Sequence, residues 1–143
     1  MKLRSVEEEA CIDQIGELLH AYQKFLLVIN EKLIPGELTY SRYVTAVESV
    51  LWGVMDNLHK IHLLKDILSG MTMGVTDELD THIEREQQLI QQLKEANRTA
   101  IAQLQVITLN WSRVETSSRN AHHFDLAIEE LENLSTQVKN YGH

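Results

Sequence analysis

The sequence predicts an all-α fold in which three long antiparallel helices and a short C-terminal helix pack as a coiled-coil-like bundle. Apolar residues recur at alternating spacings of three and four, and an average of 3.5 is the repeat of helices packed along one another. One proline and six glycines in 143 residues are too few for a loop-rich or all-β chain. With 43% hydrophobic residues, a chain of this length is expected to form a single domain, residues 1–143.

The first helix is predicted to begin near Ser5, where an N-cap residue is followed by glutamates that suit the positive end of a helix. It is expected to run to about Leu33 and to end before Pro35, because proline lacks an amide donor and restricts the residue before it. Its expected apolar stripe consists of Ile12, Ile15, Leu19, Tyr22, Leu26, Ile29 and Leu33.

The second helix is expected to open at Glu37 or Thr39 and to continue to about Leu68. A connector between Gly70 and Gly74 then leads to Thr76, which is predicted to cap a third helix with acids in its first turn. The apolar stripe of the second helix consists of Tyr40, Val44, Val47, Leu51, Val54, Leu58 and Ile61.

The third helix is predicted to be the longest, from Asp77 to about Thr116, or roughly 60 Å at 1.5 Å per residue. A polar stretch, residues 116–120, is expected to separate it from a short fourth helix that carries an apolar stripe from Phe124 to Val138. Because the helices are unequal, we expect the third to project past its neighbours or to pack against a second copy of the chain.

An apolar stripe left over in a soluble protein usually indicates a partner. We therefore predict that the third helix binds another helix, from a partner or from a second copy. Asn97 has two interpretations: a polar amide on the stripe that fixes register or oligomeric state, or a residue at the edge of a rotated stripe. Glu86 also interrupts the stripe, so packing near it is expected to be looser. The predicted partner-binding residues are Leu93, Asn97, Ala100, Leu104, Ile107 and Trp111.

The methionines and tryptophans offer a second candidate surface. Methionine adapts to irregular partners, but it also fills gaps in cores. Both interpretations therefore stay open for this set, which consists of Trp52, Met55, Met71, Met73 and Trp111.

No motif for catalysis, a metal or a cofactor stands out. His59 and His62 share a helix face, but the Glu-x-x-His pattern of di-metal carboxylate bundles does not occur. Both histidines are expected at the edge of the stripe or in solvent, and Cys11 is expected to be a small buried or half-buried residue. The prediction is a protein that is not an enzyme and has no metal site and no cofactor.

The net charge of −8 argues against binding to nucleic acid or to anionic membranes, which need a positive field. No stretch approaches the ~20 apolar residues of a membrane span, and the first ten residues do not resemble a signal peptide. We therefore expect a cytoplasmic protein without membrane insertion.

The segment from Leu93 to Ile101, with Asn97 at its centre, resembles the third helix of FlgN-type flagellar export chaperones. That resemblance implies a small, acidic, cytoplasmic helical protein whose first two helices form a hairpin. It also implies binding of hook–filament junction proteins, through the C-terminal part, until export. This sequence departs from the family pattern: it lacks the second nearby asparagine, and its tail carries an amphipathic helix.

The expected function is non-enzymatic partner binding, most concretely by a cytoplasmic chaperone or adaptor of the flagellar or type III export kind. Two alternatives remain: a structural subunit of a coiled-coil assembly, and a small helical enzyme or metal-binding bundle.

Overall fold

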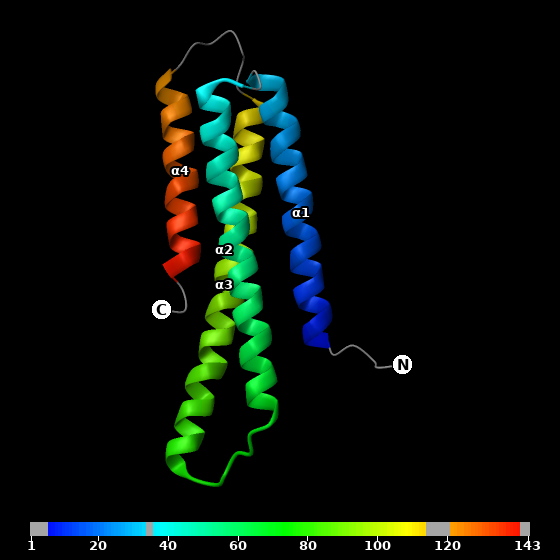
Figure 1. Ribbon diagram of the computed structural model, residues 1–143, viewed down its shortest axis with the longest axis vertical. Coiled ribbons are helices and arrows are strands. Elements are labelled where there is room, and N and C mark those ends of the chain that lie inside the picture. The colour runs from blue at the N-terminus through cyan, green and yellow to red at the C-terminus, as the bar shows by residue number, and fades with distance from the viewer. Residues whose placement is uncertain (1–5, 34–35, 114–120, 141–143) are drawn as a thin grey trace.

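The computed structural model describes residues 6–33, 36–113 and 121–140, and it describes side chains over 13–33, 36–113 and 127–139. Its elements are α1 (Val6–Lys32), α2 (Leu38–Ser69), α3 (Asp77–Ser112) and α4 (Ala121–Asn140). The predicted all-α fold is confirmed: three long helices and a shorter C-terminal one pack against each other, with each helix antiparallel to the next (Figure 1). The predicted cap at Ser5, the polar stretch 116–120 and the side chains of Cys11 and Phe124 lie outside what is described.

The turns follow the sequence signals. Gly36 and Gly74 have φ angles of 97° and 87°, in the left-handed region that glycine enters without steric cost. The predicted cap of α3 is confirmed, because the hydroxyl of Thr76 accepts a hydrogen bond from the amide of Leu79 at 3.1 Å. Glu37 occupies the N-cap position of α2, but its side chain makes no capping hydrogen bond.

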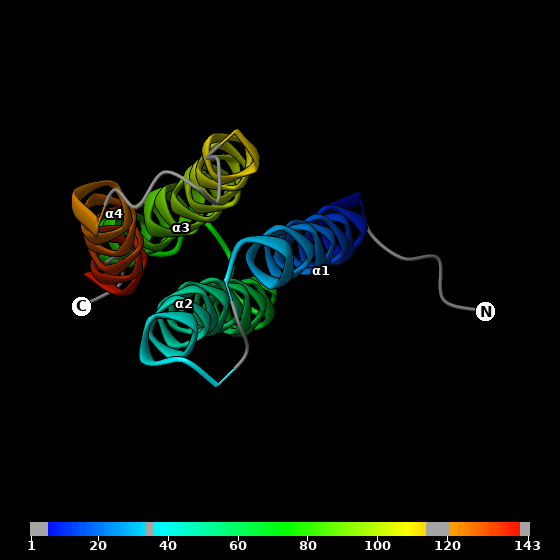
Figure 2. The same ribbon diagram turned by 90° about the horizontal axis from the view of Figure 1, so that it is seen from above.

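Viewed from above, the four helices form a flattened diamond (Figure 2). The α2–α3 hairpin lies at the centre, with α1 on one side of it and α4 on the other. Over the described residues α1 does not contact α4, whereas each of them packs against both hairpin helices. The hairpin is therefore the scaffold, and the two outer helices each fill one of its two grooves.

The length mismatch is resolved differently from the expectation of a single projecting helix. The α3 helix does extend past the ends of α1 and α4, but α2 extends with it (Figure 1). The end of the α2–α3 hairpin, with the connector that joins the two helices, therefore stands clear of α1 and α4. Glu86, which interrupts the α3 stripe, is half-buried in this region.

The core agrees with the predicted stripe on α3 and α4, and with the α1 stripe only in part. Of the α1 stripe, Ile29 is fully buried, and Ile15, Tyr22 and Leu33 pack partly buried against the core. Leu18 and Phe25 of α1 are fully buried, whereas Leu19 from the predicted stripe is 47% exposed. Residues 18, 21, 25 and 29 satisfy the same three–four spacing, so the inward face of α1 is rotated by about one residue from the predicted face. The large fully buried side chains are Trp111, Tyr43, Phe25, Leu18, Ile29, Ile61, Leu93, Leu104, Leu131, Val47, Val50 and Val54.

Candidate partner-binding surface

The stripe of α3 that the sequence assigned to a partner lies inside the bundle. None of its six side chains is more than 3% exposed, because α1, α2 and α4 of the same chain cover them. In this fold they are core residues, so any surface open to a partner must be formed by other side chains. The six are Leu93, Asn97, Ala100, Leu104, Ile107 and Trp111.

Asn97 is at the centre of a buried polar layer that links all four helices. It is fully buried, so the interpretation that placed it at the edge of the stripe does not hold. Its side-chain oxygen accepts a hydrogen bond from Asn57 at 3.1 Å, and its amide nitrogen donates to Gln14 Oε1 at 3.4 Å. Asn57 also donates to the backbone carbonyl of Val138 at 3.1 Å. The amide therefore has its partners within the chain, where it aligns α1, α2 and α3.

The bond to Val138 has a second consequence, for the end of α4. The last four carbonyls of a helix have no partner within the helix, and Val138 belongs to that last turn of α4. Asn57 satisfies this carbonyl from the neighbouring helix. The polar layer therefore sets the register of α4 along the hairpin.

Small residues on α2 let α4 approach closely. A Cβ added to Gly53 would lie 2.7 Å from Cγ1 of Val138, which is closer than real contacts allow. One helical turn earlier, the hydroxyls of Ser49 and Ser135 form a 2.7 Å hydrogen bond, and Lys139 donates to Ser49 at 2.7 Å. The roles of Gly53 and Ser49 are not visible in the sequence, because the α4 residues that they contact lie more than eighty positions away.

The tryptophan and methionine set divides into one buried and four exposed residues. Trp111 packs edge-on against Tyr43, with ring centroids 4.8 Å apart and an interplanar angle of 86°. Met71 and Met73 are exposed in the connector at the tip of the hairpin, while Trp52 and Met55 are exposed on α2. The four exposed residues can therefore take part in an adaptable surface for a partner, whereas Trp111 belongs to the core.

Trp52, Met55 and Leu63 form what we call the outer band of α2. They are 64%, 36% and 50% exposed, and spacings of three and eight place them within about 80° of one another around the helix. Leu63 lies outside the three–four stripe predicted for α2, because that stripe follows the side of the helix that faces the core. Asp56 and His59 lie on the same face and are exposed.

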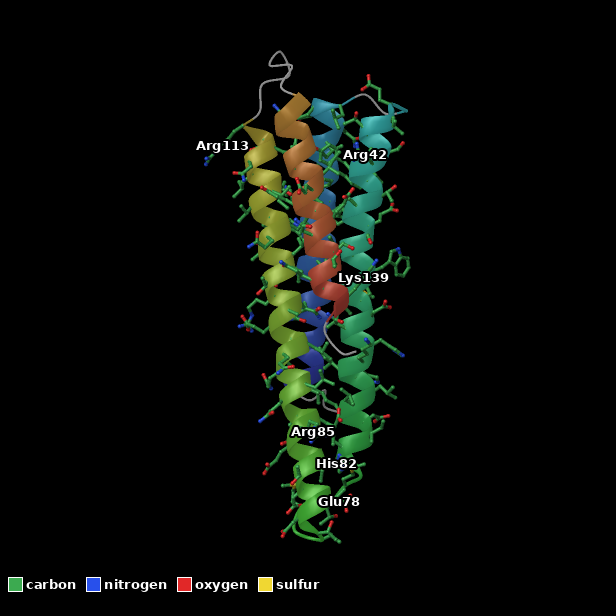
Figure 3. The ribbon with its side chains drawn as sticks, turned by 90° about the vertical axis from the view of Figure 1, so that its left-hand side faces the viewer. Arg42, Glu78, His82, Arg85, Arg113 and Lys139 are labelled. Atoms are coloured by element: carbon green, nitrogen blue, oxygen red, sulfur yellow. The ribbon has the colours of Figure 1, made fainter. Side chains whose placement is uncertain are left out.

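Other described features of the surface are two histidines and a groove between α2 and α4. His59 and His62 are both exposed, as expected. Five of the ten residues that line a groove of about 590 Å³ between α2 and α4 carry hydroxyl groups, and Arg42 and Lys139 are also among them (Figure 3). Among the described residues, no group of three or more histidine, cysteine, aspartate or glutamate side chains is arranged to hold a metal ion. No described helix contains a stretch long and apolar enough to cross a bilayer.

Comparison of the chain with protein-family models, with curated proteins and with solved structures gives no match. The interpretation of this surface therefore depends on the residues themselves.

Proposed function

We propose that this protein is a non-enzymatic partner-binding protein, a cytoplasmic chaperone or adaptor that covers an amphipathic helix of another protein. The observation that supports the proposal is the outer band of α2. Its three apolar side chains, an exposed tryptophan among them, share one helix face with Asp56 and His59. Tryptophan and methionine are enriched at protein interfaces, and exposed apolar surface of this kind commonly marks an interaction site.

The proposed mechanism is helix-on-helix docking. A partner helix places its own apolar face along the outer band, and Met55 adjusts its flexible side chain to the shape of that helix. Asp56, on the same face, and the overall charge of −8 keep the free protein in solution. A chaperone of flagellar or type III export type, the class that the segment around Asn97 resembles, is the most concrete form of this function.

The test is a photocrosslinking experiment in cells that produce the protein. Benzoylphenylalanine replaces Met55 in one variant and Gln91 in a matched control, since Gln91 is exposed on α3 away from the outer band. We expect an adduct of discrete mass at position 55 that is absent at position 91. We also expect the added substitution Trp52→Ser to abolish it.

The captured protein is then purified and mixed with the wild-type chain. A chaperone keeps this partner from aggregating at equimolar ratio, as measured by light scattering, and Trp52→Ser weakens the protection. The same adducts at both positions, or no adduct from a correctly folded variant, would overturn the proposal.

A structural subunit of a helical assembly is the second candidate, and the uncovered end of the α2–α3 hairpin favours it. Such a subunit would aggregate or unfold when produced alone, whereas a chaperone or adaptor would be soluble and folded without its partner. Solubility and circular dichroism of the isolated chain distinguish the two.

A further inference from the structure

Two hydrogen bonds between tyrosines and their partners show how α1 and α2 lie against each other on the surface of the bundle. The hydroxyl of Tyr22 on α1 donates to the carboxylate of Glu48 on α2 at 3.3 Å. Further along α1, Asn30 accepts a hydrogen bond at 2.7 Å from Tyr40, which lies earlier on α2 by the same number of residues. The two helices therefore run antiparallel in a constant register, and the bond to Glu48 marks the outer side of the line where they meet.

This register places apolar side chains of α1 beside the outer band of α2. Leu19 and Ile15 lie one and two helical turns before Tyr22, on the same face of α1. The corresponding turns of α2 carry Trp52 and Met55. Leu19 is 47% exposed, and Ile15 is half-buried. Figure 2 shows α1 beside α2, with no other described helix on the outer side of this pair.

The outer band therefore continues onto α1, and the two parts together form what we call the outer seam. Its exposed apolar side chains come from both helices, so a docked helix would rest in the furrow between α1 and α2 and not on α2 alone. The outer seam consists of Ile15, Leu19, Trp52, Met55 and Leu63.

The charged side chains beside the outer seam are acidic. Three exposed carboxylates of α2 lie within about 60° of Trp52 around the helix, on both sides of the line from Trp52 to Leu63. They are Glu48, Asp56 and Asp66. The described residues on this face of α2 include His59 but no lysine or arginine, and those on the Leu19 face of α1 carry no charge.

We propose that the outer seam binds an amphipathic helix with lysine or arginine on both sides of its apolar face, which specifies the partner in the proposed function and therefore depends on that function. The apolar face of the partner helix contacts Leu19, Trp52 and Met55, while its cations approach the three carboxylates. The net charge of −8 attracts such a helix before contact. An acidic helix, or the outer seam of a second copy, would instead bring like charges together.

A display library of helical peptides tests the proposal on the full chain. The carboxylates span roughly 27 Å of α2 at 1.5 Å per residue, so peptides of about 18 residues cover them. Every peptide has leucine at three–four spacing, and its flanking positions carry lysine, glutamate or glutamine at random. Selection on wild type with counter-selection on Trp52→Ser discards peptides that only follow the net charge, which this variant retains. We expect the remaining peptides to carry lysine in place of glutamate.

Fluorescence anisotropy of a selected peptide, labelled with fluorescein, then measures how each part of the outer seam contributes. Asp56→Lys should raise Kd about tenfold, because it replaces attraction with repulsion. Glu84→Lys makes the same charge change on an exposed position of α3 and should leave Kd within about twofold of wild type. Added sodium chloride should weaken binding, because exposed charges are screened.

The contribution of α1 has its own matched pair of variants. Leu19→Ser should raise Kd about fivefold, because the peptide loses apolar contact with α1. Leu109→Ser removes an equally large exposed side chain from α3 and should have no effect. Circular dichroism checks that each variant is folded.

The outcomes separate this proposal from the proposed function. Selected peptides that depend on Trp52 but show no preference for lysine would overturn the basic partner and leave partner binding by the outer band intact. Equal effects of Asp56→Lys and Glu84→Lys would do the same. If no peptide distinguishes wild type from Trp52→Ser, docking of a basic helix on the outer seam is wrong. Capture of a partner by crosslinking at position 55 would then still support the proposed function.

Discussion

The side-chain amide of Asn57 donates a hydrogen bond to the side-chain oxygen of Asn97 at 3.1 Å in the centre of the bundle. Both residues are almost completely buried. A buried amide without a hydrogen-bond partner lowers the stability of the fold. The hydrogen bond between the two asparagines offsets this cost for both side chains. The pair holds α2 and α3 in one register, and its further bonds to Gln14 and Val138 connect it to α1 and α4.

The first prediction concerns this pair. Asn97→Leu should lower the free energy of unfolding by about 1–3 kcal/mol, because it leaves polar atoms of Asn57 and Gln14 with fewer partners. An asparagine that served only to specify pairing with another chain would give the opposite result, a higher melting temperature and a broader oligomer distribution. Urea denaturation of the single variants and of Asn57→Leu/Asn97→Leu gives the coupling. If the pair is coupled, the double variant loses less than the sum of the single ones.

The second prediction concerns Gly53, for which Gly16 is a matched control. Alanine normally stabilises a helix interior relative to glycine, and Gly16→Ala on α1, with open space around its Cβ, should gain about 0.5–1 kcal/mol. Gly53→Ala should instead lose about 1–3 kcal/mol, because the new methyl group forces Val138 and α4 away from α2. Thermal melts of the two variants measure the contrast. Equal gains at both positions would show that α4 does not pack tightly there.

The third prediction contrasts the two tryptophans. Trp111→Ala removes a buried ring packed on Tyr43 and should cost about 3–5 kcal/mol. Trp52→Ala changes an exposed residue and should stay within about 0.5 kcal/mol of wild type. Iodide should quench the fluorescence of Trp52 and spare that of Trp111, as measured in variants that keep one tryptophan each. Strong quenching of Trp111 in the native protein would contradict its place in the core.

The fourth prediction is a loss of stability in alkali that involves Tyr22. Burial, with a smaller contribution from the carboxylate of Glu48, raises the pKa of the Tyr22 hydroxyl above 10.0; its O–H donates to that carboxylate at 3.3 Å. The neutral phenol is thus favoured in the folded state, and its contribution to stability is fully present below pH 10. This contribution declines as the pH rises from 10 through the raised pKa.

Tyr22→Phe cannot ionise at this position, so its free energy of unfolding should fall less between about pH 9 and pH 11 than that of wild type. Urea denaturation at each pH provides the measurement. Parallel curves for the two proteins would show that the hydroxyl has the same pKa in the folded and unfolded states.

Periodicity and turn chemistry are local properties, and they were enough to predict much of the fold. The helix cap at Thr76, the end of α2 and the inward face of α3 all follow from residues within a few turns of one another. For the same reason the sequence placed Asn97 correctly on an apolar stripe. It could not supply the partners of Asn97, because Gln14 and Asn57 lie 83 and 40 residues away.

What covers each face was decided only by the tertiary structure. A three–four stripe on α3 looks the same whether α1, α2 and α4 or another protein covers it, so the six predicted partner-binding residues turned out to be core. The two stripes available on α1 are equally periodic, and packing selected the one with Leu18 and Phe25. Trp52 is exposed because no other described helix covers its side of α2. The end of the α2–α3 hairpin is uncovered because α1 and α4 stop short of it (Figure 1), and the position of α4 is set by contacts with Asn57 and Gly53 across the bundle.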